Sequence, residues 1–240
     1  MKTSYNFLRV IFTFVTVFSL TLSTLQVKPQ PALAQSQDGG IQRDYNAESG
    51  KVTRITGKGD EPLVVMSAMS ADMTPAERSD VLVQTFAPEF GLTSPSEELT
   101  LADESQPDAD RVVTKYQQVY NGVPVLGGEL IVNASDKGEL YSMNGEVSQG
   151  LSLDTDPAIS VETAIDIAKQ GMTKWYGGNP EDYTYKNAEL SIFDESLIGG
   201  PGLRPAELVW RMDLTPVDAG QPIREFVTKP LTHPSHIPIM

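Results

Sequence analysis

The run from Tyr116 to Val132 constrains the fold more than any other part of the chain. It reads Tyr-Gln-Gln-Val-Tyr-Asn-Gly-Val-Pro-Val-Leu-Gly-Gly-Glu-Leu-Ile-Val. Residues 111–120 are rich in β-forming side chains and alternate between two faces, which predicts a strand. Asn121-Gly122 is a strong signal for a two-residue hairpin turn. Gly127-Gly128 allows a bulge or a close backbone approach, so we expect a hairpin whose second strand is irregular.

A helix with clear boundaries precedes this hairpin. Thr74 and Glu77 form the pattern of a capping box, and Pro75 suits the first helical position. Apolar residues then recur at helical spacing as far as Phe90. Pro88 fits poorly inside a helix, so we expect an irregular last turn that ends at Gly91. Residues 93–109 are acidic and contain Ser, Pro and Asp, and we interpret them as a loop.

A second helix is predicted over residues 161–176, with Ser160 as its cap and Gly177-Gly178 at its end. One side of this helix is apolar and consists of Val161, Ala164, Ile165, Ala168, Met172 and Trp175. Further strands are predicted at residues 51–56, 129–134, 139–147, 183–193, 206–215 and 223–228. A helix followed by an antiparallel meander, twice over, indicates an α+β fold. We expect two small subdomains, each a helix packed on a curved antiparallel sheet in a cystatin-like arrangement, at residues 51–150 and 155–228.

The N-terminus has the pattern of a signal peptide. Lys2 and Arg9 precede a mostly apolar run, and Ala32-Leu33-Ala34 matches the small-x-small cleavage site. An uncleaved membrane anchor is the alternative, but the run is short for a span, which needs about 20 apolar residues. We therefore expect secretion with cleavage after Ala34. Residues 35–50 are polar, and we expect a flexible leader there.

The charge of the chain argues against two classes of partner. It has 18 basic and 32 acidic residues, a net charge of −14, and this becomes about −17 once residues 1–34 are removed. Such a surface repels nucleic acid and anionic lipid, and we expect neither partner and no stable membrane anchor. The chain has no Cys, which excludes disulfides and thiol chemistry.

The chemistry available to the chain is equally restricted. Its two histidines, His233 and His236, both lie near the C-terminus, and no His-Glu-x-x-His sequence occurs. A thermolysin-type zinc site therefore cannot be formed from these residues, and His-dependent nucleophilic systems are implausible. Most carboxylates lie in predicted loops and turns, where a solvated surface is the simpler interpretation. We expect no catalytic residues, no cofactor and no metal.

The tract from Arg111 to Val147 resembles the fungalysin/thermolysin propeptide (FTP) segment, the pro-region of secreted thermolysin-like zinc proteases. The resemblance rests on Tyr116-Gln117-Gln118, on Tyr120 to Val125, on Gly127-Gly128 and on the turn near Gly138. It implies a pro-region that assists folding of a catalytic domain and blocks its cleft. The family-motif or interface residues it suggests are Tyr116, Gln117, Gln118, Tyr120, Gly122, Val123, Pro124, Gly127 and Gly128. The alternative for Tyr116, Tyr120 and Val123 is a purely structural role in the sheet and core.

Residues 155–228 resemble the PepSY segment that follows FTP in such pro-regions. The similar elements are Ala164-Ile165-x-x-Ala168 on a helix and Leu208-Val209-Trp210-Arg211 on a strand. Residues 229–240 depart from the family pattern, because three prolines cannot sustain a central strand. This off-pattern tail suggests a frameshifted or truncated protease precursor.

Together these features predict a secreted, propeptide-like protein that is not an enzyme. Its expected partner is the catalytic domain of a thermolysin-like protease, bound in cis within a precursor or in trans, which it would help to fold, inhibit, or both. The alternative is a stand-alone extracellular binding module with no protease partner.

Overall fold

The computed structural model describes residues 36–38, 40–59, 61–63, 69–70, 72–200, 202–217 and 223–228. The expected signal peptide and its cleavage site, and the off-pattern tail from residue 229 onward, lie outside the described residues.

The first helix, α1 (Pro75–Phe86), begins as its sequence predicts. The backbone N–H of Glu77 donates to Thr74 Oγ1 at 3.3 Å, and the Glu77 carboxylate accepts from the Thr74 N–H at 2.7 Å. These reciprocal bonds satisfy two of the free N–H groups of the first turn. The irregular last turn is also confirmed, because η1 (Ala87–Phe90) is a 3-10 turn that contains Pro88 and ends at Gly91 with φ of 100°.

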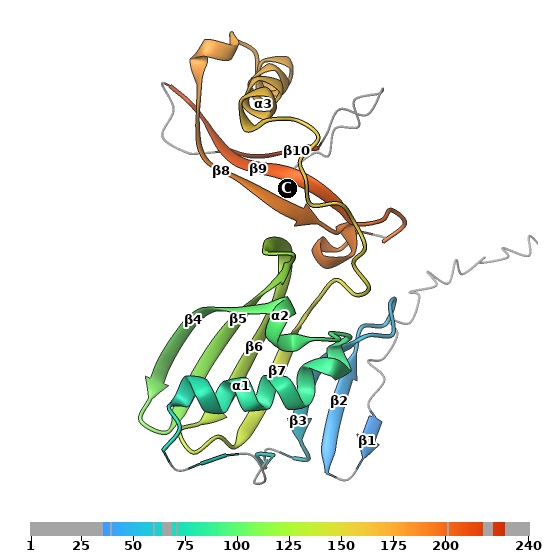
Figure 1. Cartoon of the computed structure of the whole chain (residues 1–240), viewed down its shortest axis with the longest axis vertical. Helices are drawn as coiled ribbons and strands as arrows, with labels where there is room; N and C mark the ends of the chain where they lie inside the picture. Colours follow the sequence, from blue (N-terminus) through green and yellow to red (C-terminus); the bar gives the residue numbers. More distant parts are fainter. Residues whose placement is uncertain are drawn as a thin grey trace, which may run out of the picture. The chain divides into compact units, whose positions relative to one another are not determined.

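Helix α1 lies across one face of an antiparallel sheet (Figure 1). The strand order of this sheet is β1-β2-β3-β7-β6-β5-β4. Its strands are β1 (Ser36–Asp38), β2 (Ile41–Tyr45), β3 (Val52–Gly57), β4 (Leu99–Asp108), β5 (Arg111–Tyr120), β6 (Val123–Ser135) and β7 (Leu140–Glu146). Leu82, Val83 and Phe86 of the helix are buried in one cluster with apolar side chains from β3, β5, β6 and β7. Each such side chain contributes about 1.5–3 kcal/mol through burial.

The expectation of a flexible leader at residues 35–50 is wrong for Ile41–Tyr45, which forms β2 and pairs antiparallel with β3. The strand has three polar residues between Ile41 and Tyr45, so its sequence shows no alternation. Pairing with β3 satisfies its backbone, and Arg43 forms an ion pair with Glu89, 46 residues away. These long-range contacts are invisible to a local pattern.

The expectation of a loop at residues 93–109 is also wrong. The segment forms a short helix, α2 (Pro95–Glu98), and then the strand β4, which pairs antiparallel with β5. In β4 only Leu99 is buried, and the other nine residues are exposed. A strand that is exposed on both faces carries no hydrophobic alternation, because its backbone pairing alone holds it in the sheet.

The second helix, α3 (Val161–Tyr176), packs on a separate antiparallel sheet. Its cap is confirmed, since the Thr163 N–H donates to Ser160 Oγ at 3.3 Å. The strands of this sheet are β8 (Tyr183–Phe193), β9 (Glu207–Pro216) and β10 (Ile223–Thr228). The predicted apolar side of α3 is buried at Ala164, Ile165, Ala168 and Met172, whereas Trp175 is 38% exposed.

The described residues therefore form two hydrophobic clusters, one beneath α1 and one beneath α3. Among the residues with a described position, one parallel pair, Val125 of β6 with Ile192 of β8, joins the two sheets. Helices packed on antiparallel sheets confirm the predicted α+β class. Within the described residues, no helix is long and apolar enough to cross a membrane.

Candidate functional site

The hairpin turn of the motif tract is built as its sequence predicts. Asn121 and Gly122 both have positive φ angles, 51° and 79°, as a type I′ turn requires. On either side of the turn, Tyr120 pairs with Val123, and Val119 pairs with Pro124. The chain of β6 thus returns beside β5 immediately after the turn.

The expected bulge is present at Gly127-Gly128. Gln117 pairs with Glu129, but the next described pair is Val119 with Pro124, so β6 has extra residues at this point. Gly127 has a φ of 75°, a conformation that side chains other than glycine rarely adopt. A Cβ on Gly128 would lie 2.7 Å from Gln118 Oε1. The backbone conformation therefore favours glycine at position 127, and the close approach of the Gln118 side chain favours it at position 128.

Gln117 holds this bulge through its side-chain amide. Its Nε2 donates to the carbonyl oxygens of Val125 at 2.7 Å, Gly128 at 2.9 Å and Gln118 at 3.0 Å. Carbonyl groups that leave the sheet ladder at a bulge need other partners. The amide of Gln117 supplies them, so this residue fixes the shape of the bulge.

Gln118 connects the bulge to the chain after β7. Its Nε2 donates to the Ser148 carbonyl oxygen at 2.7 Å, and its Oε1 accepts from the Ser148 N–H at 2.8 Å. Gln118 is 1% exposed and Ser148 is 3% exposed, so water does not compete for these bonds. The side chain acts as a short piece of strand that pairs with the Ser148 backbone.

Tyr116 has a different environment from the two glutamines. It is buried in the cluster beneath α1, and its hydroxyl donates to Asp80 Oδ1 at 2.6 Å. Burial, this hydrogen bond and the charges of Asp80 and Glu104 all raise the pKa of the Tyr116 hydroxyl. Tyr120 and Val123 are half-buried beside the turn. Tyr116 therefore has a structural role in the core. Gln117, Gln118, Gly127 and Gly128 instead form one local assembly at the bulge.

Ser148 and Asp194 extend this assembly and were not singled out in the sequence. Ser148 Oγ donates to Asp194 Oδ2 at 2.5 Å, and Asp194 Oδ1 accepts from the Ser196 N–H at 3.0 Å. Burial acts to raise the pKa of Asp194, but the hydrogen bonds from Ser148 and Ser196 and the charge of Lys51 together hold the pKa below its ordinary value. In the sequence, the Asp-x-Ser pattern at residues 194–196 is the local signal that would have suggested the bond between Asp194 and Ser196.

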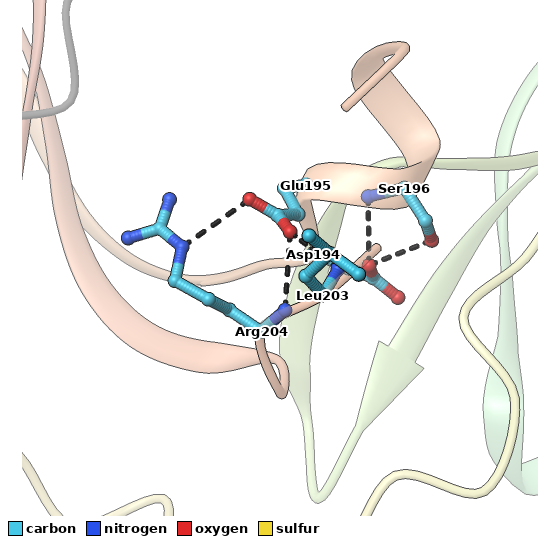
Figure 2. Close-up of polar contacts among 5 residues, drawn as sticks. All are labelled: Asp194, Glu195, Ser196, Leu203 and Arg204. Carbon is cyan, nitrogen blue, oxygen red and sulfur yellow. Dashed lines mark hydrogen bonds and ion pairs between the residues drawn. The ribbon is translucent and has the colours of Figure 1, made fainter. Parts of the chain in front are cut away.

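Figure 2 shows how the chain after Asp194 is organised. The Glu195 carboxylate, in η3 (Glu195–Ile198), accepts from the backbone N–H of Leu203 at 2.7 Å and of Arg204 at 3.1 Å. It also accepts from Arg204 Nε at 3.2 Å. The hydrogen bonds and the Arg204 charge hold the pKa of Glu195 below its ordinary value. We call the described residues of this stretch, 194–200 and 202–204, the clamped loop.

A cavity of about 530 Å³ lies beside the clamped loop. Its lining includes Lys51, Glu146, Ser148, Asp194 and Arg204, so basic and acidic groups both face it. Among the described residues, no group of three or more His, Asp or Glu side chains could hold a metal ion. The wall of this cavity thus combines charged groups with hydrogen-bonding groups.

The chain thus has an α+β fold in which Gln117 and Gln118 of the motif tract fix the local backbone geometry. Residues 97–147 match the family model of the Fungalysin/Thermolysin Propeptide Motif. All nine motif residues expected from the sequence fall within this match. A propeptide motif is a non-catalytic segment, so the matched residues are assigned no catalytic role.

Three similar proteins each match this chain over a small part of their own length. Thermolysin of Alicyclobacillus acidocaldarius subsp. acidocaldarius is 36% identical over 77 residues, 31% of this chain and 14% of that protein. Bacillolysin of Bacillus amyloliquefaciens is 31% identical over 83 residues, 34% of this chain and 16% of that protein. Bacillolysin of Bacillus cereus is 35% identical over 92 residues, 35% of this chain and 16% of that protein. The match to these relatives thus spans about one seventh of their length. The resemblance of residues 155–228 to PepSY stays a prediction.

Proposed function

We propose that this chain is a secreted, propeptide-like protein that binds the catalytic domain of a thermolysin-like metalloprotease. Binding assists folding of that domain, inhibits it, or does both. The interaction takes place in cis within a precursor or in trans between separate chains. The carrying observation is the propeptide-motif match over residues 97–147, together with similarity to thermolysin and bacillolysin sequences.

The geometry of the motif tract supports a binding role. The side-chain amides of Gln117 and Gln118 form hydrogen bonds with backbone groups of the bulge and of Ser148. Such bonds fix the surface before a partner arrives, and preorganisation reduces the ordering cost of binding. The net charge of −14 adds long-range attraction toward a partner surface that is basic, which raises the association rate at low salt.

The test is a titration of purified chain against a purified thermolysin-like protease, with hydrolysis of a peptide substrate as the readout. We expect saturable inhibition, and a higher yield of active enzyme when the denatured protease refolds with the chain present. A Gln118→Leu variant, which loses both bonds to Ser148, should inhibit more weakly. An unrelated acidic protein of the same net charge serves as the control for electrostatic effects.

Two outcomes separate the proposed function from its alternative. Inhibition or assisted refolding that the acidic control does not reproduce supports the protease partner. If the folded chain neither binds nor refolds any thermolysin-like enzyme, the proposal is wrong, and a stand-alone extracellular binding module becomes the better interpretation.

A further inference from the structure

The clamped loop presents two apolar side chains to solvent. Leu203 is 84% exposed, more than any other large apolar side chain in the described part of the chain, and Ile198 is 45% exposed. A single exposed leucine is common on protein surfaces. Three further features of the same loop set it apart from an ordinary solvated turn.

The first feature is that the loop is ordered by its own hydrogen bonds. The Glu195 carboxylate holds the N–H groups of Leu203 and Arg204, and the Glu195 carbonyl accepts from the Gly200 N–H at 2.8 Å. Asp194 holds the other end of the loop through Ser196. The backbone that displays Leu203 is therefore fixed in advance, and binding through it loses less conformational entropy.

The second feature is the absence of charge at the tip. Residues 196–203 read Ser-Leu-Ile-Gly-Gly-Pro-Gly-Leu and contain no ionisable side chain. Of the two acids that precede this run, Glu195 pairs with Arg204, and Asp194 is bonded to Ser148 and Ser196. The centre of a protein interface is depleted in charged residues relative to the rest of the surface. A neutral apolar tip on a strongly acidic chain fits that description.

The third feature is that the propeptide motif lies directly against the loop. A Cβ placed on Gly127 would lie 3.5 Å from the Leu197 carbonyl oxygen and 3.8 Å from Ile198 Cγ2. Ser148, which Gln118 holds, donates in turn to Asp194. The bulge and the two glutamines therefore position a loop that lies outside the matched residues 97–147.

We propose that the clamped loop is a docking loop, with Leu203 and Ile198 entering an apolar pocket on the protease catalytic domain. This inference rests on the proposed function, because it takes the protease as the partner. The contact with the protease then lies outside the matched residues 97–147, and the matched motif positions the loop. The partner surface is apolar and concave, with no requirement for a charge opposite the tip.

The test compares Leu203→Ser with Leu101→Ser in the full chain. Leu101 is 54% exposed on β4 and provides the same substitution at a site away from the loop. Burial of a leucine in a pocket is worth enough to change an equilibrium constant about tenfold or more. We expect the inhibition constant of Leu203→Ser to rise by about that factor, while that of Leu101→Ser stays within about twofold. Thermal unfolding of both variants should match the parent chain.

Glu195→Ala supplies a second variant that leaves both apolar side chains in place. Without the carboxylate the loop must order on binding, and we expect inhibition to weaken about threefold to tenfold. If the parent chain inhibits the protease and Leu203→Ser inhibits equally well, the docking loop is refuted while the proposed function stands. If the folded parent chain itself does not bind, the proposed function fails and this inference fails with it.

Discussion

Replacement of Gln118 by leucine tests the central connection of the motif tract. The substitution removes the amide that bonds both the N–H and the carbonyl of Ser148, at 2.8 Å and 2.7 Å. Ser148 is 3% exposed, so neither group gains water in exchange. Each unsatisfied buried group costs about 1–3 kcal/mol. The two together cost about 2–6 kcal/mol, from which the apolar leucine recovers about 1 kcal/mol. We expect a net loss of about 3 kcal/mol.

Equilibrium unfolding in urea measures this loss directly, by circular dichroism and by fluorescence of the same samples. The matched control is Gln106→Leu, since Gln106 is exposed and its amide makes one bond, to the Ala109 carbonyl at 3.2 Å. A domain has a total stability of about 5–15 kcal/mol, so the expected loss shifts the midpoint clearly. If Gln118→Leu costs less than about 1 kcal/mol, or no more than the control, the Ser148 groups do not depend on Gln118.

Three further predictions follow from the same structure. Gly128→Ala should destabilise the chain by about 1–3 kcal/mol in the same assay, because a Cβ would lie 2.7 Å from Gln118 Oε1. Ser160→Ala removes the cap of α3 and should cost about 1 kcal/mol, with Ser160→Asp close to the parent. Asp194 and Glu195 have pKa values lowered from 3.8 and 4.5, so the folded state favours their charged forms. Their contribution to stability is complete above those ordinary values and is lost as pH falls through the lowered folded ones. Thermal midpoints between pH 6 and pH 3 should fall, and less steeply for Asp194→Asn.

The features that the sequence predicted well are those set by neighbouring residues. The capping box of α1 links Thr74 to Glu77 across three residues, and Ser160 caps α3 in the same way. The Asn121-Gly122 turn depends on the φ angles of two adjacent residues. The bulge was predicted from two consecutive glycines, Gly127 and Gly128. Each of these signals is contained in a few residues, so a local pattern was enough.

The features that the sequence missed depend on residues far apart in the chain. Strand β2 is held by β3 and by the ion pair of Arg43 with Glu89, and β4 is held by its pairing with β5. Neither strand shows alternating burial. The contact of Ser148 with Asp194 spans 46 residues, so no spacing rule suggests it. All nine motif residues fall within residues 97–147, but only the geometry shows which of their side chains bond to the backbone.

Strand β4 has a consequence for the behaviour of the chain at high concentration. In the described part of the chain it pairs with β5 alone, so its other side is the outer edge of the first sheet. Its register shifts between Leu101 and Asp103 and again between Ser105 and Asp108, and it contains Pro107. An open strand edge invites pairing with another molecule, and kinks, proline and carboxylates are the means by which natural sheets prevent it. The irregular acidic edge is thus a safeguard against aggregation.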